Sequence, residues 1–310
     1  MLRRLLPLLL ATVGFCEPPS PPDQPSEGPG GAKYAHASMR ESQHGSGGEE
    51  YWIFEPEAPS ATNAPLIIFL HGFSVMDPYG YRGWIEHLVR RGNVVIYPRY
   101  QESLLTKPID FHTNTLAAVR AAMTTLKEAG RTKVDLERVA AVGHSAGAVL
   151  AMRYASVAGD EHLPVPKAAA IVQPGQGPKN GLAVLAMPAT EKLPAQLRLI
   201  VAVGDKDTIV GEGSARRIWR ETLGIKERAY VKVQTDLHGE PRLRAGHLSP
   251  MAADLELADA LDWFGWWRLF DAACESAFAG KPLRLDPAMG NWSDGQPMKP
   301  LVIEMDSAGP

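Results

Sequence analysis

A serine between two glycines is the first feature of this sequence that could do chemistry. The pentapeptide GHSAG, residues 143–147, follows an apolar run at 138–142 and precedes an Ala-rich stretch at 146–158. A serine forced through a tight turn between a strand and a helix projects its hydroxyl away from the backbone, and the glycines let the chain pass close to its neighbours. The pattern alone occurs by chance in glycine-rich chains, but this context favours a nucleophilic serine at Ser145.

A serine hydroxyl is a weak nucleophile near neutral pH and needs two partners. A histidine must take its proton, and a carboxylate must orient that histidine. Asp205 and Asp207 follow one apolar run, 197–203, and His238 and His247 follow another, 230–234. These residues predict a Ser-His-Asp triad and leave the acid and the base open between two candidates each.

The elements that must position these residues alternate between strand and helix from residue 51 onward. Continuous apolar runs predict buried strands, and apolar residues spaced three and four apart predict amphipathic helices. The predicted strands are 51–54, 65–70, 93–97, 138–142, 167–172, 197–203 and 230–234, and the predicted helices are 81–89, 116–126, 146–158, 213–223 and 257–278. This alternation predicts an α/β fold with a mostly parallel central sheet flanked by helices on both faces.

Composition excludes several classes of function. The 310 residues are 45% hydrophobic and carry a formal net charge of −3, which suits one α/β catalytic domain over residues 49–310. Without a basic stripe or tract, we expect no nucleic-acid partner. The sequence has no His-Glu-x-x-His, no paired-cysteine spacing and no Gly-x-Gly-x-x-Gly after its first strands. We therefore expect neither a metal nor a cofactor.

The N-terminus has the pattern of an export signal. Residues 1–16 combine a basic start, a short apolar core and a small-x-small ending, which predicts a signal peptide and a secreted or periplasmic protein. The apolar stretch is far shorter than the roughly 20 residues of a membrane span. A lipid anchor at Cys16 is the alternative. Residues 17–48 are rich in Pro, Gly, Ser and Glu, and we expect a disordered linker there.

Taken together, these motifs resemble the α/β-hydrolase superfamily over roughly residues 51–278. The tripeptide His71-Gly72-Phe73 is similar to that family's oxyanion loop, residues 143–147 to its nucleophile elbow, and residues 204–207 to its acid turn. The chain order of nucleophile, acid and histidine also matches the family. Within the superfamily, the chain is most similar to an exported esterase, chlorophyllase-like and polyester-hydrolase-like branch.

The resemblance favours one member of each competing pair. Asp207 fits the family's turn Gly-x-x-Asp-x-x-Val, whereas Asp205 is expected to bond to the local backbone. His247 lies directly ahead of the long C-terminal helix, where the family usually places its base, whereas His238 is expected in a surface turn. The implied triad is Ser145, His247 and Asp207.

The same resemblance implies where charge is stabilised and where substrate binds. The backbone N–H groups of Phe73 and Ala146 are the expected oxyanion-hole donors. Met76 and Tyr79 lie in and just after the oxyanion loop and are expected to line an apolar substrate pocket. His144 is expected to position the elbow rather than to transfer protons.

These expectations define the function that the sequence predicts. The chain is expected to be a serine hydrolase that cleaves small-molecule carboxylic esters through an acyl-enzyme. Two alternatives stay open: a peptidase or thioesterase that uses the same triad, and a non-enzymatic relative that binds a partner. The sequence does not indicate an oligomeric state.

Overall fold

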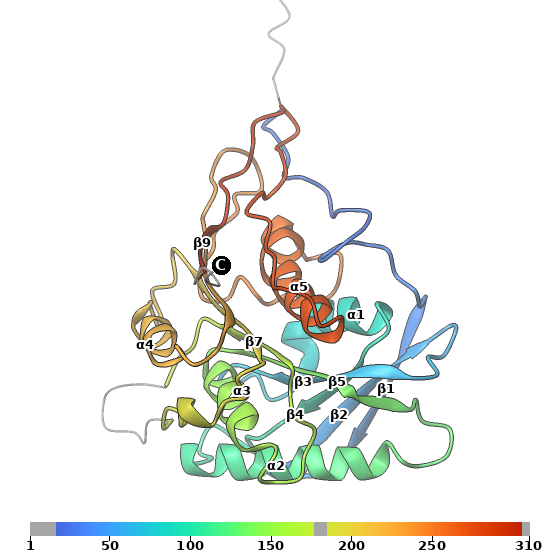
Figure 1. Cartoon of the computed structure of the whole chain (residues 1–310). Coiled ribbons are helices and arrows are strands. Elements are labelled where there is room, and N and C mark those ends of the chain that lie inside the picture. Colours follow the sequence, from blue (N-terminus) through green and yellow to red (C-terminus); the bar gives the residue numbers. More distant parts are fainter. Residues whose placement is uncertain (1–16, 177–184, 306–310) are drawn as a thin grey trace, which may run out of the picture.

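A nine-stranded sheet organises the part of the chain that the computed structural model describes, residues 17–176 and 185–305 (Figure 1). Its order is β1-β2-β4-β3-β5-β6-β7-β8-β9. The strands are β1 (Ser38–His44), β2 (Tyr51–Glu57), β3 (Ala64–Leu70), β4 (Val94–Pro98), β5 (Val134–His144), β6 (Ala168–Val172), β7 (Arg198–Gly204), β8 (Glu227–Val233) and β9 (Val302–Met305). Strands β4, β3 and β5 to β8 are parallel, and β1, β2 and β9 pair antiparallel at the two ends. The predicted mostly parallel α/β fold is confirmed.

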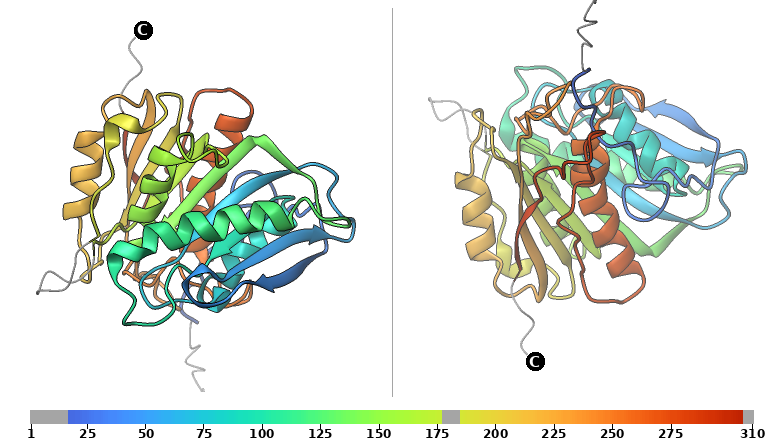
Figure 2. Two further views of the ribbon diagram at one scale, coloured as in Figure 1. Left: turned by 90° about the horizontal axis from the view of Figure 1, so that it is seen from below. Right: turned by 90° about the horizontal axis from the view of Figure 1, so that it is seen from above.

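Helices cover both faces of the sheet. The helices are α1 (Arg82–Arg90), α2 (Pro108–Thr125), α3 (Ala146–Val157), α4 (Gly213–Glu221) and α5 (Trp267–Phe278). Helices α2, α3 and α4 pack on one face, and α1 and α5 pack on the other. Figure 2 shows α2 and α3 in front of the sheet in one view and α5 in front of it in the other.

The central strand β3 shows why its sequence is a continuous apolar run. Successive side chains of a strand point to opposite faces, so a strand covered on both sides needs apolar residues at every position. Ile68 packs into the core beneath α2 and α3, whereas Ile67 and Phe69 pack into the core beneath α1 and α5. All three are fully buried.

The N-terminal segment corrects one prediction, because residues 17–48 are not a disordered linker. Ser38–His44 forms β1 and pairs along its whole length with β2. Upstream, the chain passes beside α5 (Figure 1), and the Gly30 N–H donates to Asp271 Oδ2 at 2.8 Å. The prediction was wrong because it rested on side-chain composition. The residues that hold this segment in place, in β1 and at Gly30, do so through hydrogen bonds of their backbone groups. The predicted signal peptide, residues 1–16, lies outside the described residues.

The C-terminal part differs from the sequence prediction in two details. The last helix begins with a π-helical turn, Asp262–Trp266, that continues directly into α5. The short strand β9 then closes the far end of the sheet against β8.

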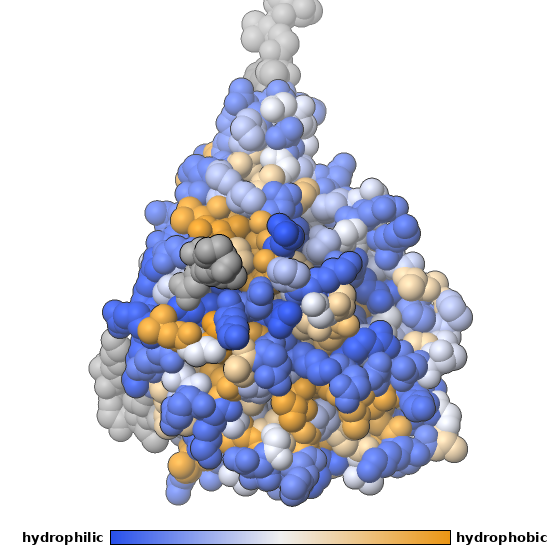
Figure 3. All heavy atoms as spheres, viewed as in Figure 1, coloured by the Kyte–Doolittle hydropathy of each residue, from blue (hydrophilic) through white to orange (hydrophobic). Residues whose placement is uncertain are grey.

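Among the described helices, none has both the length and the apolar character needed to cross a membrane. On the face shown in Figure 3, hydrophilic residues separate scattered hydrophobic patches.

Candidate active site

The candidate residues meet because the central strands are parallel. In such a sheet the carboxyl ends of neighbouring strands lie at the same edge, which is where α/β folds place their sites. Ser145 directly follows β5, Asp207 follows β7, and His247 lies in the loop after β8. The end of β3, which leads into the oxyanion loop, lies beside the end of β5, with Leu70 opposite Gly143.

The turn at Ser145 has the conformation of a nucleophile elbow. Ser145 has φ 57° and ψ −120°, a backbone conformation that residues other than glycine avoid. A Cβ on Gly143 would lie 2.1 Å from the Gly147 carbonyl oxygen, and a Cβ on Gly147 would lie 2.1 Å from the Leu70 carbonyl oxygen. Both glycines are therefore required, since they let the chain turn from β5 into α3 against β3.

Three predicted residues form a connected hydrogen-bonded group. His247 Nε2 lies 3.0 Å from Ser145 Oγ, and His247 Nδ1 lies 2.8 Å from Asp207 Oδ2. The His247 side chain is 7% exposed and that of Asp207 is 1% exposed. The structure thus brings together Ser145, His247 and Asp207 at hydrogen-bond distances, with the histidine between the hydroxyl and the carboxylate.

Backbone donors hold the Asp207 carboxylate in place. Asp207 Oδ1 accepts from the N–H groups of Ile209 and Val210, at 3.0 Å in both cases. Burial opposes ionisation of this carboxyl, but the hydrogen bonds from His247 and these backbone groups outweigh it and lower its pKa. An ionised Asp207 accepts from Nδ1–H and so leaves the lone pair of His247 Nε2 facing Ser145.

The two rejected candidates have other partners. Asp205 Oδ1 accepts from the backbone N–H of Thr235 at 2.9 Å. His238 Nε2 lies 2.8 Å from Asp294 Oδ2, and both side chains are 39% exposed. His238 therefore lies at the surface, as predicted, whereas Asp205 bonds to the backbone of Thr235, 30 residues along the chain, and not to its own turn as predicted.

The oxyanion loop leaves one backbone donor for a substrate. The Gly72 N–H donates to the Tyr81 hydroxyl at 2.9 Å, and the Ser74 N–H donates to Gln101 Oε1 at 2.9 Å. Between them, the Phe73 N–H has no acceptor among the described residues. A Cβ on Gly72 would lie 3.5 Å from Ser145 Cβ, so the loop passes close to Ser145.

The second predicted donor belongs to helix α3. Ala146 is the first residue of α3 and follows the nucleophile directly. The first N–H groups of a helix have no partner within it, and the helix dipole favours negative charge at this end. Phe73 and Ala146 thus approach the elbow from two strands, β3 and β5, with donors that a developing oxyanion could use.

The two residues predicted to bind substrate differ in their placement. Tyr79 lies on the 3-10 turn Pro78–Tyr81 and is 69% exposed, whereas Met76 is partly buried. Phe73 is 43% exposed, and its ring centroid lies 6.3 Å from that of Phe111 on α2.

Val210 is a residue near the nucleophile that sequence reasoning assigned to the acid turn alone. A Cβ on Gly175 would lie 3.4 Å from Ser145 Oγ and 2.5 Å from Val210 Cγ1. Gly175 therefore lies beside the serine hydroxyl, and the Val210 side chain lies beside Gly175. Its position six residues after β7 was a usable signal, because loops at the carboxyl ends of parallel strands line the site.

The contacts of three further polar residues were not predicted. Gln101 and Gln173 come shortly after the buried strands β4 and β6, at the same edge as the nucleophile. Both are fully buried. Tyr81 was predicted on the apolar face of the helix at 81–89 and near the substrate pocket, but the bond from the Gly72 N–H to its hydroxyl was not predicted. A polar residue within three positions of the end of a buried parallel strand was the signal that could have identified both glutamines.

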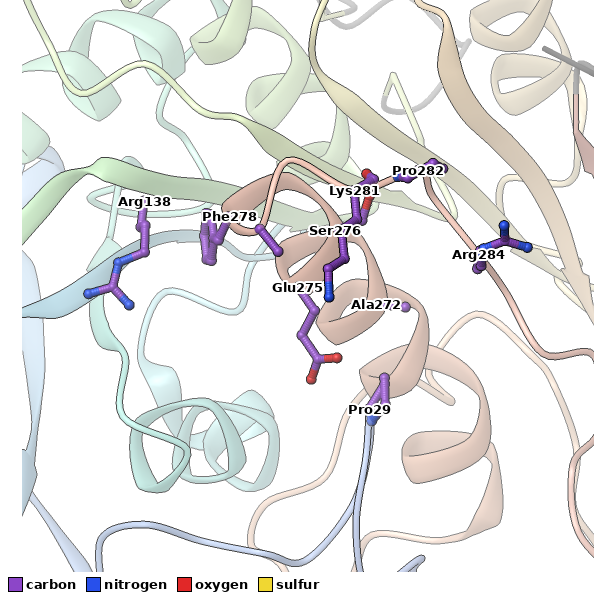
Figure 4. Close-up of a pocket in the computed structure, with 10 residues that line it drawn as sticks. Pro29, Arg138, Ala272, Glu275, Ser276, Phe278, Lys281, Pro282 and Arg284 are labelled. Atoms are coloured by element: carbon purple, nitrogen blue, oxygen red, sulfur yellow. Dashed lines mark hydrogen bonds between the residues drawn. The ribbon is translucent and has the colours of Figure 1, made fainter. Parts of the chain in front are cut away.

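A metal-binding group and a second hollow are the other features that could mark a functional site. Within residues 17–176 and 185–305, no group of three or more His, Cys, Asp or Glu side chains is arranged to hold a metal ion. A hollow of about 550 Å³ lies against α5 and is lined by Pro29 of the N-terminal segment and by Glu275 and Ser276 of α5 (Figure 4). Its lining contains none of the three connected residues, so it is separate from the candidate site.

Known proteins resemble this chain in fold. Residues 67–196 match a family described as the alpha/beta hydrolase fold. A search of curated proteins gave no match. A fungal esterase structure from Rhizomucor miehei is similar with a TM-score of 0.59 at 17% identity, covering 80% of this chain and 87% of that one.

A second solved structure gives the same picture. A variant of the esterase rPPE matches with a TM-score of 0.56 at 17% identity, covering 80% of this chain and 84% of the other. At these identities the likeness shows the fold. The predicted resemblance to the α/β-hydrolase superfamily is confirmed, whereas the placement in an exported esterase branch stays a prediction.

Proposed function

We propose that the chain, whose fold is that of the α/β hydrolases, is a serine hydrolase that cleaves small carboxylic esters through an acyl-enzyme. The observation that carries this proposal is the connected group of Ser145, His247 and Asp207. A histidine whose Nε2 faces a serine hydroxyl, and whose Nδ1 faces a buried carboxylate, is arranged to remove the serine proton.

Each residue has one role in the proposed reaction. His247 Nε2 accepts the proton of Ser145 while Oγ attacks the ester carbonyl carbon. The same nitrogen then protonates the leaving alcohol, and the acyl group remains on Ser145. A water molecule, deprotonated by His247, attacks the acyl-enzyme and releases the acid. Asp207 keeps the imidazole in the required tautomer and stabilises its protonated form.

The negative charge of each tetrahedral intermediate falls on the former carbonyl oxygen. The N–H groups of Phe73 and Ala146 are placed to stabilise it, since neither has an acceptor among the residues that the structure describes. Loss of one such donor typically costs about 3 kcal/mol in kcat. Fixed backbone donors therefore supply a large share of the proposed rate enhancement.

The surroundings of Ser145 favour small acyl groups. Gly175 lies close to Ser145 Oγ and the Val210 side chain packs beside Gly175, which restricts the space on that side. The connection between β6 and β7, residues 173–197, is short for the helical caps that cover the sites of many lipases. We propose a preference for short- to medium-chain and aromatic esters over long-chain lipids and peptides.

Ester hydrolysis by matched serine variants tests this proposal. Ser145→Ala should lower kcat by several orders of magnitude with the melting temperature unchanged, because the nucleophile is lost and the fold is not. Ser156→Ala is the control: it removes a hydroxyl on the same helix whose one partner among the described residues is the Arg153 carbonyl. Wild-type turnover by purified Ser145→Ala would refute the proposal.

A substrate panel separates the proposed activity from its alternatives. Butyrate and aromatic esters should exceed long-chain triglycerides by about tenfold or more in kcat/KM, a difference of about 1.4 kcal/mol. Val210→Ala should reduce this difference in kcat/KM, because the smaller side chain opens space near the serine. Faster cleavage of thioesters or peptides than of oxygen esters would reassign the substrate class, and no turnover of any acyl compound would favour a binding role.

We also propose that the protein is exported, on the basis of residues 1–16 alone. Mass analysis of the N-terminus of the mature protein tests this. A start just after residue 16 supports cleavage, and a lipid-modified Cys16 supports the anchored alternative. An intact Met1 in the folded protein would contradict both.

A further inference from the structure

An unbroken series of hydrogen bonds runs behind the candidate site, from the oxyanion loop to the loop of the general base. The Gly72 N–H lies 2.9 Å from the Tyr81 hydroxyl, which lies 2.7 Å from His144 Nδ1. His144 Nε2 lies 3.1 Å from Gln173 Oε1, and Gln173 Nε2 lies 2.8 Å from the Gly246 carbonyl oxygen. The four bonds connect loops that follow β3, β5, β6 and β8.

The direction of every bond in this series is fixed by its two ends. A backbone N–H can only donate, so the Tyr81 oxygen accepts from Gly72 and its own proton goes to His144 Nδ1. His144 must then carry its proton on Nε2, which donates to Gln173 Oε1. The Gln173 amide in turn donates to the Gly246 carbonyl, which can only accept. The opposite histidine tautomer would place two donors or two acceptors face to face.

The series also requires a neutral His144. A protonated ring would present Nδ1–H to the Tyr81 hydroxyl, whose proton would then have no acceptor there. Burial, helped by the nearby His247, lowers the pKa of His144 to about 3, so the ring is uncharged at neutral pH. The two histidine rings are 4.7 Å apart. A neutral His144 avoids repelling His247 when that residue becomes protonated during the reaction.

We propose that Tyr81, His144 and Gln173 act together as positioning residues that fix the oxyanion loop and the His247 loop relative to the nucleophile elbow. This proposal rests on the proposed esterase function and adds a device for alignment to it. At one end, the series occupies the Gly72 N–H and so holds the adjacent Phe73 N–H toward the substrate. At the other, it fixes the carbonyl of Gly246, the residue before the general base.

The series should behave as one unit, since breaking any bond disconnects its two ends. Tyr81→Phe removes the hydroxyl at one link, and Gln173→Met removes both bonds of another at similar volume. Each variant should lower kcat by about 10- to 100-fold, the range expected when a catalytic donor is misaligned, with KM changed by less than about threefold. The kcat of the double variant should lie within about twofold of the kcat of the slower single variant.

Tyr154→Phe is the matched control for the hydroxyl deletion. Tyr154 is fully buried, and its hydroxyl donates one bond to the Pro164 carbonyl at 2.8 Å, away from the series. It should lose stability but keep wild-type kcat. The proposal would be overturned if the fold-loss in kcat of the double variant equalled the product of the losses in Tyr81→Phe and Gln173→Met. Equal losses of kcat in Tyr81→Phe and Tyr154→Phe would also overturn it.

Histidine NMR provides a test that needs no variant enzyme to be active. With ¹⁵N-labelled histidine, His144 should be the neutral tautomer with its proton on Nε2, and it should stay neutral down to pH 5. His144→Asn assigns the signal. A proton on Nδ1, or a protonated ring at pH 6, would overturn the proposal even if every kinetic variant failed to fold.

The outcomes distinguish failure of this inference from failure of the proposed function. If ester turnover requires Ser145 but Tyr81→Phe keeps wild-type kcat, the positioning series is wrong and the esterase remains. If wild-type protein shows no Ser145-dependent turnover, the proposed function is wrong, and the NMR tautomer alone then decides whether the series exists as described.

Discussion

Two buried His–Asp pairs in this molecule have almost the same geometry and different surroundings. His247 Nδ1 lies 2.8 Å from Asp207, and His87 Nε2 lies 2.9 Å from Asp271. The first pair lies at the carboxyl edge of the sheet, and the second joins α1 to α5. The difference between them lies in what the other ring nitrogen contacts.

The second nitrogen of His247 faces a serine, whereas that of His87 faces a tyrosine. Ser145 Oγ lies 3.0 Å from His247 on a strained elbow beside free backbone donors. The Tyr34 hydroxyl lies 3.2 Å from His87 in the N-terminal segment, and burial raises its pKa. In the proposed mechanism a hydrogen-bonded His–Asp pair acts only together with a nucleophile and donors for the oxyanion, and only the first pair lies beside such groups.

The surroundings of Asp271 are those of a structural cross-link. Burial opposes its ionisation, but His87, Arg91 at 3.2 Å and the Gly30 N–H at 2.8 Å together lower its pKa. His87 is fully buried and stacks on Trp267 with ring centroids 4.6 Å apart. This pair fastens the N-terminal segment to α1 and α5.

The largest expected contrast comes from removing the charge of each carboxylate. Asp207→Asn should lower kcat by about 10⁴-fold, because the amide stabilises the wrong histidine tautomer. Asp271→Asn should leave kcat within about threefold of wild type. Steady-state ester kinetics measure both. Asp205→Asn is the control for Asp207, and a larger loss in that variant would show that the acid had been assigned to the wrong residue.

Truncation tests the cross-link as a whole. Removing residues 1–48 deletes Tyr34, Gly30 and β1, so Asp271 loses a partner and the edge of β2 is exposed. We expect a loss of more than about 3 kcal/mol in the free energy of unfolding, or aggregation through the exposed edge. Denaturant unfolding measures it, with a chain that begins at residue 17 as control. Equal stability of the two chains would contradict the structural role.

A smaller loss should follow from Asp271→Asn. Breaking a buried ion pair costs about 3 kcal/mol where partners can relax. The folded-state pKa of Asp271 is lowered, so its contribution is present above the unfolded-state pKa of about 3.9 and is lost as the pH falls through the folded-state value. Unfolding of wild type and variant should therefore differ by a constant amount near neutral pH and converge in acid. A difference that grows in acid would contradict this assignment.

The smallest effect should come from Tyr34→Phe. It removes one hydrogen bond to His87 and leaves the Asp271 bonds intact. We expect a loss of about 1 kcal/mol in unfolding free energy and unchanged kcat. Thermal unfolding and ester kinetics check the two parts. A kcat loss comparable with that of Tyr81→Phe would mean that the two His–Asp pairs are coupled.

The sequence predicted the residues of the candidate triad better than the polar contacts that hold the surrounding loops and the N-terminal segment in place, for a physical reason. Ser145, Asp207 and His247 each lie in a local pattern: an elbow between strand and helix, a turn after a strand, and a loop before a helix. Buried parallel strands also have a strong local signal, since they must be apolar at every position.

The supports depend on contacts between residues far apart in the sequence. Gly30 and Asp271 are 241 residues apart, and Gln173 and Gly246 are 73 apart. Such polar contacts carry no periodic pattern. Strand β1 was missed for a related reason, because its side chains are nearly all polar and leave pairing to the backbone.

Covalent labelling tests the central claim most directly. A fluorophosphonate reacts with a serine only where the hydroxyl is activated and the phosphoryl oxygen is stabilised, as at a hydrolase site. Intact-protein mass and peptide mapping should find one adduct, on Ser145, that forms at least about 100-fold more slowly in His247→Ala and not at all in Ser145→Ala. An adduct on another residue, or no adduct on the folded wild-type protein, would contradict the assignment of Ser145 as the nucleophile.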